Sequence, residues 1–149
     1  MLFARYGQGL LVLHERQTRF SIVLHPLDRK AVLTARTIAR QLGKLPQALR
    51  KTISFDNGTE FAEHHRLHNA LGVQTFFCDP HSPWQKGGVE NSIGRLRRSL
   101  PRKTDLKAIT AAALKRLAQR LNDTPRKCLD FNTPAEAFSK LKSIVAIQT

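Results

Sequence analysis

Two kinds of apolar periodicity alternate along this chain, and together they limit the folds it can adopt. Short segments rich in β-branched, aromatic and other apolar residues lie at residues 9–13, 20–24, 52–55 and 73–77. Longer segments in which apolar residues recur every three or four positions follow them. Such alternation predicts an α/β fold. A chain of 149 residues is long enough for one core, so we expect residues 1–149 to form a single domain.

Local signals divide this pattern into elements. The polar residues 14–19 between the first two apolar segments predict a β-hairpin. Helices are expected at residues 29–45, with Asp28 as N-cap, at 61–71, ended by Gly72, and at 89–100. The remainder is expected to be helical: apolar residues recur from 106 to 121, and Thr133 and Glu136 form a capping box for a last helix.

The charge of the chain indicates its partner. Lys and Arg number 25 against 11 Asp and Glu, which gives a formal charge of +14. A polyanion is the expected partner, and nucleic acid is favoured over a membrane because no amphipathic helix collects the basic residues. The alternative is a protein that is merely soluble and basic. No apolar run is long enough to span a bilayer, no signal peptide is apparent, and Cys78 and Cys128 are far apart, so we expect a cytoplasmic protein.

Two acidic residues stand at positions suited to metal chemistry. Asp56 follows the apolar segment 52–55 and precedes Asn57 and Gly58, which are turn residues, so a strand is expected to place Asp56 at its C-terminal tip. Glu90 lies in the first turn of the helix expected from residue 89. Carboxylates gathered at such an edge can hold two divalent cations about 3.5–4 Å apart, and Mg²⁺ suits them. The alternative is that Asp56 is only a turn residue and Glu90 only a helix-terminal acid.

The helix that carries Glu90 is strongly basic. Gly94 and Arg97 lie about 40° and 20° from the direction of Glu90, so the three share one face, where Gly94 leaves room for a partner. Nearby cations can contact phosphates without reading sequence; they are Lys86, Arg95, Arg97, Arg98, Arg102 and Lys103. The alternative is a solvated basic face.

Two further features leave alternatives open. Trp84 suits either stacking on a base or anchoring its loop to the core. His64, His65 and His68 have helical spacing, but without a matching Cys or carboxylate pattern we expect polar surface histidines rather than a metal site.

Several long motifs, in order, resemble a known family. The segment 54–61, Ser-Phe-Asp-Asn-Gly-Thr-Glu-Phe, resembles the D-N-G-x-E-F segment of DDE transposases and retroviral integrases. The segments 77–91 and 95–104 are similar to the third-acid region of the insertion-sequence-thirty family. The same family's second-strand segment and closing signature resemble residues 13–20, 121–122, 125–127 and 133–136.

The resemblance implies a fold and an activity. The fold would be RNase H-like: a mixed sheet flanked by helices, with a helical C-terminal part. Asp56 and Glu90 would be the second and third metal-binding acids. The cofactor would be Mg²⁺ or Mn²⁺, as two ions in the complete enzyme, and the reaction would be strand cleavage and strand transfer at transposon ends. The partners would be transposon-end and target DNA and further copies of the chain, in the bacterial cytoplasm at the nucleoid. The residues expected to contact DNA are Asn57, Lys86, Asn91, Arg95, Arg97, Arg98, Arg102 and Lys103.

The first acid of the family lies on its first strand, before the segment matching residues 9–16. No acidic residue precedes residue 9 here, so we expect a chain truncated at its N-terminus, with residues 1–6 as the remnant of an incomplete first strand. It would be a fragment, a start assigned too late or a decayed element. Three hypotheses follow: a transposase core completed by a longer chain, an inactive remnant that only binds DNA or intact transposase, and an unrelated ribonuclease of RNase H-like fold.

Overall fold

The computed structural model describes residues 2–3, 9–24, 30–101 and 103–147. Two compact units make up the chain: residues 1–26 together with 87–149, and residues 27–86. The fold is mixed α/β, as predicted, with helices alone in its C-terminal part. The expectation that residues 1–149 form a single domain stays a prediction.

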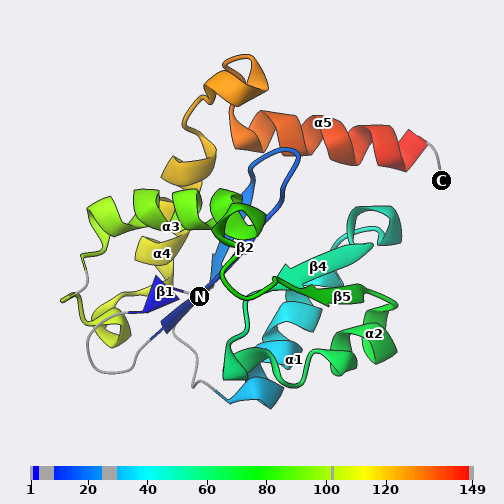
Figure 1. Ribbon diagram of the computed structural model, residues 1–149. Helices are drawn as coiled ribbons and strands as arrows, with labels where there is room; N and C mark the ends of the chain where they lie inside the picture. Colours follow the sequence, from blue (N-terminus) through cyan, green and yellow to red (C-terminus); the bar gives the residue numbers. More distant parts are fainter. Residues whose placement is uncertain (1, 4–8, 25–29, 102, 148–149) are drawn as a thin grey trace. The chain divides into compact units, whose positions relative to one another are not determined.

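The first unit is built on an antiparallel sheet with strand order β1-β2-β3 (Figure 1). Its elements are β1 (Leu2–Phe3), β2 (Gly9–His14), β3 (Ser21–Leu24), α3 (Gly87–Ser99), α4 (Ala111–Asn122) and α5 (Pro134–Ile147). The predicted hairpin is confirmed, since Val12 pairs with Val23 and His14 with Ser21. In the range 1–6, where a strand remnant was expected, only Leu2–Phe3 lies within the described residues.

Helices α3 and α4 pack on this hairpin and bury its apolar face (Figure 1). Leu10 and Val12 of β2 share one face and are 0% and 7% exposed, and Leu11 on the other face is 1% exposed, so both faces of this strand are buried. The core consists of Leu10, Val12, Val23, Leu96, Leu100, Leu106, Leu114 and Leu121. Burial of these side chains, which include Leu100 and Leu106 from the segment between α3 and α4, holds β2, β3, α3 and α4 together.

The N-termini of α4 and α5 are each capped by a threonine side chain. Thr110 caps α4, because its Oγ1 accepts a hydrogen bond from the Ala113 amide at 3.1 Å. Leu106–Ala108 therefore form a separate 3₁₀ turn before the cap, and the helix starts later than the apolar period suggested. The capping box of α5 is confirmed: the Thr133 amide donates to Glu136 at 2.8 Å, and the Glu136 amide donates to the Thr133 hydroxyl at 3.2 Å.

The second unit pairs two parallel strands and two helices. Its elements are α1 (Ala31–Leu42), β4 (Thr52–Phe55), α2 (His65–Leu71) and β5 (Gln74–Phe77). The strands pair in parallel, with Phe55 opposite Phe77. Helix α1 ends three residues earlier than expected. Lys30 stands at its N-cap position, where its side chain makes no capping hydrogen bond, and Asp28, the expected cap, lies outside the described residues.

The segment between β4 and α2 differs from the prediction. A helix was expected from residue 61, but Thr59–Phe61 form a 3₁₀ turn and α2 begins at His65. The ring of Phe61 stacks on that of Phe55, with centroids 4.6 Å apart, so this residue packs on the strand before the helix starts. Gly72 ends α2 as predicted, in the left-handed conformation at φ 66°.

Within the described residues, no helix combines the length and the apolar character that crossing a membrane requires.

Candidate catalytic and DNA-binding site

Asp56 lies at the C-terminal tip of β4, where the sequence placed it. The Cys78 amide donates to the Phe55 carbonyl at 2.8 Å, and the Asn57 side-chain amide donates to the Cys78 carbonyl at 3.2 Å. These two bonds join the ends of β4 and β5 on either side of Asp56, which is half-buried. The pairing of the strand ends therefore holds the backbone that presents the carboxylate. Asn57 itself is exposed, and its contact with DNA stays a prediction.

Gly58 is needed because the buried Glu60 carboxylate lies over it. A Cβ at Gly58 would be 2.7 Å from Glu60 Oε2, and Glu60 is only 3% exposed. The Phe61 amide donates to the Gly58 carbonyl at 3.0 Å and closes the turn. The D-N-G-x-E-F segment thus has a physical basis here: an amide that bridges two strands, a glycine under a folded-back acid, and a phenylalanine in the core.

The loop after β5 is closed by one side chain. Gln85 donates through Nε2 to the Asp79 carboxylate at 2.8 Å and accepts from the Asp79 amide at 2.8 Å. The neighbouring Trp84 is 75% exposed, so the interpretation of this residue as an anchor to the core is wrong. Its interpretation as a stacking surface for a base stays a prediction.

Glu90 lies in the first turn of α3, as expected, although the helix begins at Gly87 rather than at Val89. Both Glu90 and Asn91 are exposed. The start of α3 is fixed by His14, whose Nδ1 lies 3.0 Å from the hydroxyl of Ser92 and 3.0 Å from that of Ser21. Asp56 belongs to one unit and Glu90 to the other, and their convergence stays a prediction.

His14 is held neutral by its surroundings. Burial, reinforced by the positive charge of Arg19, lowers the pKa of His14 from 6.5 to about 4. Its Nε2 is buried and has no hydrogen-bond partner among the described residues. A neutral ring therefore packs against the helix that carries Glu90, and it adds no positive charge beside that acid near neutral pH.

The predicted basic residues lie on α3 or next to it in the sequence. Arg98 and Lys103 are exposed, Lys86, Arg95 and Arg97 are half-buried, and Arg102 lies outside the described residues. Gly94 is exposed, and a Cβ added to it would have no atom of another residue within 4 Å. The face shared by Glu90, Gly94 and Arg97 is thus open at its glycine, as expected.

The histidines at the start of α2 contact neighbouring side chains. Nδ1 of His64 lies 2.8 Å from the Thr75 hydroxyl, and its ring meets that of Phe77 edge-on. Nε2 of the exposed His65 lies 3.6 Å from the Glu63 carboxylate. In the described ranges, no group of three or more His, Cys, Asp or Glu side chains could hold a metal ion.

Two buried polar residues were missed from the sequence. Asn122, 5% exposed, accepts from the Ser21 amide at 2.9 Å and donates to the Ser21 carbonyl at 2.8 Å. Arg126, 8% exposed, donates through Nη2 to the Leu121 carbonyl at 2.7 Å. Both lie in the segments that resemble the family's closing signature, which was the one available signal.

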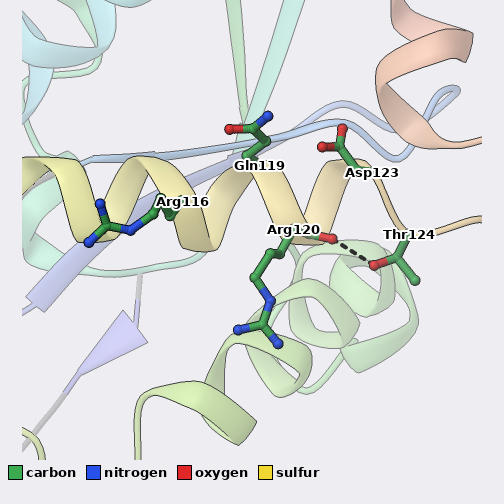
Figure 2. A pocket seen from close by; sticks show the side chains of 5 residues that line it. All are labelled: Arg116, Gln119, Arg120, Asp123 and Thr124. Carbon is green, nitrogen blue, oxygen red and sulfur yellow. Dashed lines mark hydrogen bonds between the residues drawn. The ribbon is translucent and has the colours of Figure 1, made fainter.

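A pocket of about 440 Å³ opens at the C-terminal end of α4 (Figure 2). It is lined by Arg116, Gln119, Arg120, Asp123 and Thr124. The Thr124 hydroxyl donates to the Arg120 carbonyl at 2.6 Å and closes the helix end. The pocket includes neither Asp56 nor Glu90, and we assign it no catalytic role.

Comparison with solved structures defines the class of fold. The catalytic core domain of BIV integrase matches 98% of this chain and 93% of its own, with a TM-score of 0.70 and 19% identity. The fold is therefore that of an integrase catalytic core, which is RNase H-like, as predicted.

Sequence comparison finds transposases among the relatives of this chain. The transposase of insertion sequence element IS1086 from Cupriavidus metallidurans is 38% identical over 130 residues, 87% of this chain and 38% of that transposase. The transposase of element IS30C from Escherichia coli is 37% identical over 131 residues, 88% of this chain and 34% of that protein. The homologues of this chain are thus IS30-family transposases, and the predicted resemblance is confirmed. The chain spans little more than a third of the length of these relatives, and no family model matches it.

Proposed function

We propose that the chain takes part in DNA transposition by metal-dependent cleavage and transfer of DNA strands at transposon ends. The observation that carries the proposal is the placement of Asp56 at the joined tips of two parallel strands, in a segment of integrase-core fold. Transposases of 37–38% identity over most of the chain support it. The fold by itself would not support the proposal, because one fold can host many functions.

The two acids fit a hard divalent cation. Asp56 offers a carboxylate on a backbone held by the β4–β5 pairing, and Glu90 offers a second one from a helix start. Oxygen ligands of this kind suit Mg²⁺ or Mn²⁺, and we propose two ions in the complete enzyme. Bound there, the ions would activate the attacking oxygen and stabilise the leaving oxygen of a phosphodiester.

The chain's other residues bind and position the DNA in this proposal. Arg95, Arg97 and Arg98 attract phosphates near Glu90, and Gly94 leaves space for a sugar or phosphate to approach. The exposed Trp84 offers a flat surface for an unpaired base. Asn57, Lys86, Asn91, Arg102 and Lys103 complete the proposed set of DNA contacts. Assembly of several copies on two transposon ends, at the bacterial nucleoid, belongs to the same proposal.

The second candidate function is a remnant that only binds DNA or intact transposase. The two candidates share the basic surface, so DNA binding that weakens with salt does not separate them. Catalysis does.

A strand-transfer assay with Mg²⁺ or Mn²⁺ and the element's own end DNA separates them. It compares this chain, a version extended upstream to an aspartate, and that version with Asp56→Asn or Glu90→Gln. The exposed Asp123, at the end of α4, gives a control of equal charge change in Asp123→Asn. We expect the extended chain and its control to cut and join DNA, and each acid variant to lose at least about 10²-fold in rate. Variants as active as the control would rule out the assigned acids, and extended chains that bind DNA without cutting it would favour the remnant.

A further inference from the structure

A buried arginine, Arg126, lies just after α4 and forms no ion pair with any acid of the described residues. Arg126 uses Nη2 to bind the Leu121 carbonyl, whereas its Nη1 is buried and has no hydrogen-bond partner among the described residues. A desolvated guanidinium with an unused donor is costly unless an anion compensates for it. The position therefore favours an approaching negative charge.

The neighbours of Arg126 are cations. Burial lowers the pKa of Arg126, and the positive charge of Arg95 on α3 lowers it further. Besides burial, the charges of Arg19 and Arg126 both lower the pKa of His14. Hydrogen bonds between His14 and Ser92 and between Asn122 and Ser21 bring α3 and the end of α4 to the hairpin that carries Arg19, so the three arginines lie around one region of the first unit. In the part of the chain that the structure describes, none of the three forms an ion pair.

Arg19 reaches the start of α3. Its Nη1 lies 3.5 Å from the position that a Cβ on Gly88 would occupy, and His14 Nε2 lies 2.9 Å from the same position. Arg19 also has a left-handed backbone, at φ 61°, which few non-glycine residues adopt. The hairpin turn therefore brings a cation to the first turn of α3, where the amide groups and the helix dipole are positive as well.

The acid closest in sequence to Arg19 is Glu15, and its carboxylate is engaged by the hairpin turn. Its carboxylate accepts from the Gln17 amide at 2.9 Å, from the Thr18 amide at 2.6 Å and from the Thr18 hydroxyl. Burial alone would raise the pKa of Glu15, but these hydrogen bonds outweigh it and hold the pKa below its usual value. Glu15 is therefore ionised, with its oxygens engaged by the turn, and the three arginines retain an excess of positive charge.

We propose that Arg19, Arg95 and Arg126 form a binding site for one phosphate group of the DNA backbone, where the β2–β3 hairpin, α3 and the segment after α4 meet. Arg19 and Arg95, both half-buried, contact the phosphate oxygens, and Arg126 adds a buried positive charge. The inference rests on the proposed function, because it takes the phosphate from the DNA that the transposase binds. Guanidinium groups suit phosphate geometry, and the site adds Arg19 and Arg126 to the DNA contacts assigned above.

The test is DNA binding by fluorescence anisotropy over a range of salt concentrations. Arg19→Gln and Arg95→Gln are compared with Arg116→Gln, which removes the same charge from an exposed position on α4. We expect each site variant to lose about 5- to 10-fold in affinity and to reduce the salt slope by about 0.9, the value for one phosphate contact. The control should lose less than about 2-fold, with an unchanged slope. Equal losses in all three variants, with wild-type binding intact, would overturn the site while leaving the proposed function standing. A wild-type chain that does not bind DNA would instead refute the proposed function.

A second measurement covers Arg126, whose removal also breaks the contact with the Leu121 carbonyl. Arg126→Lys keeps the charge but loses the forked donor geometry, and its folding is checked by circular dichroism. Inorganic pyrophosphate should raise the thermal midpoint of the wild type and of Arg116→Gln more than that of Arg95→Gln or Arg126→Lys. An equal rise in all four would overturn the site. Stabilisation confined to pyrophosphate, with DNA affinity unaffected by Arg95→Gln, would assign it to free phosphate compounds and overturn the DNA assignment. If polyglutamate competes with DNA as well as pyrophosphate does, the site does not distinguish phosphate from carboxylate, and its assignment to phosphate is overturned.

Discussion

The imidazole of His14 lies directly against Gly88, so that a Cβ on this glycine would be 2.9 Å from Nε2 and 3.0 Å from Cδ2. His14 ends β2, and Gly88 lies in the first turn of α3, two residues before Glu90. The opposite side of the ring contacts the hydroxyls of Ser21 and Ser92. The hairpin and the start of the helix therefore fit together only with a glycine at this position.

Gly88→Ala should destabilise the fold by about 1–3 kcal/mol, because the new methyl group collides with a ring that is held on its other side. His14→Ser makes room, so the double variant should recover part of the loss. Urea unfolding of both single variants and the double variant gives the coupling energy. Gly87→Ala is the matched control, since its Cβ would meet nothing within 4 Å. The same loss at both glycines, or no coupling with His14, would contradict the packing.

Stability should fall in mild acid because of His14. The pKa of His14 is about 4 in the folded chain against an ordinary 6.5, so between these values the unfolded chain binds a proton that the folded chain does not. The contribution is complete above pH 6.5 and is lost as the pH falls towards 4. Its upper limit is about 3 kcal/mol, and solvent screening of the half-buried ring reduces it to roughly 1–2 kcal/mol.

His14→Asn removes this titration. Urea unfolding at several pH values should show a flatter profile between pH 6.5 and 4 for the variant than for the wild type. Parallel profiles would mean that another group causes the loss.

Gly94→Ala should stabilise the chain by about 0.5–1 kcal/mol, because alanine is the better helix former and the site is open. Gly94→Trp should fold as well but should weaken DNA binding, since the indole would occupy the space beside Glu90 and Arg97. Thermal unfolding and anisotropy measure the two effects. A tryptophan variant that binds DNA normally would show that the duplex does not approach this face.

Asn122→Leu should cost about 2–4 kcal/mol, because it leaves the buried amide and carbonyl of Ser21 without partners. The control is Gln119→Leu, which places the same side chain at an exposed position one turn earlier on α4. Chemical unfolding of both variants tests the difference. A small and equal change would mean that water replaces the Asn122 contacts.

The elements predicted correctly are those defined by neighbouring residues. The hairpin, β4, the glycine end of α2 and the capping box of α5 depend on residues a few positions apart, which a single sequence displays. The starts of α2 and α4 were misplaced because a ring stack and a threonine cap, rather than the apolar period, decide where these helices begin.

Residues of the site were likewise predictable only where neighbouring residues determine their position. The positions of Asp56 at a strand tip and Glu90 in a first helical turn followed from local pattern. The roles of Asn122 and Arg126 did not, because they depend on packing between distant segments: Asn122 binds a residue 101 positions away. Trp84 was ambiguous for the same reason, since exposure is a property of the folded chain.

The contacts of Asn122 have a consequence for association between molecules. In the described part of the chain β3 is an edge strand, and an edge with unpaired amides and carbonyls can recruit a strand from another protein. Ser21 directs its N–H and C=O away from β2, and the Asn122 side chain occupies both, as the peptide group of a neighbouring strand would. A single amide thus closes the rim of the sheet at this point, so that it joins α4 to the hairpin and leaves no Ser21 group for a strand of another molecule to pair with.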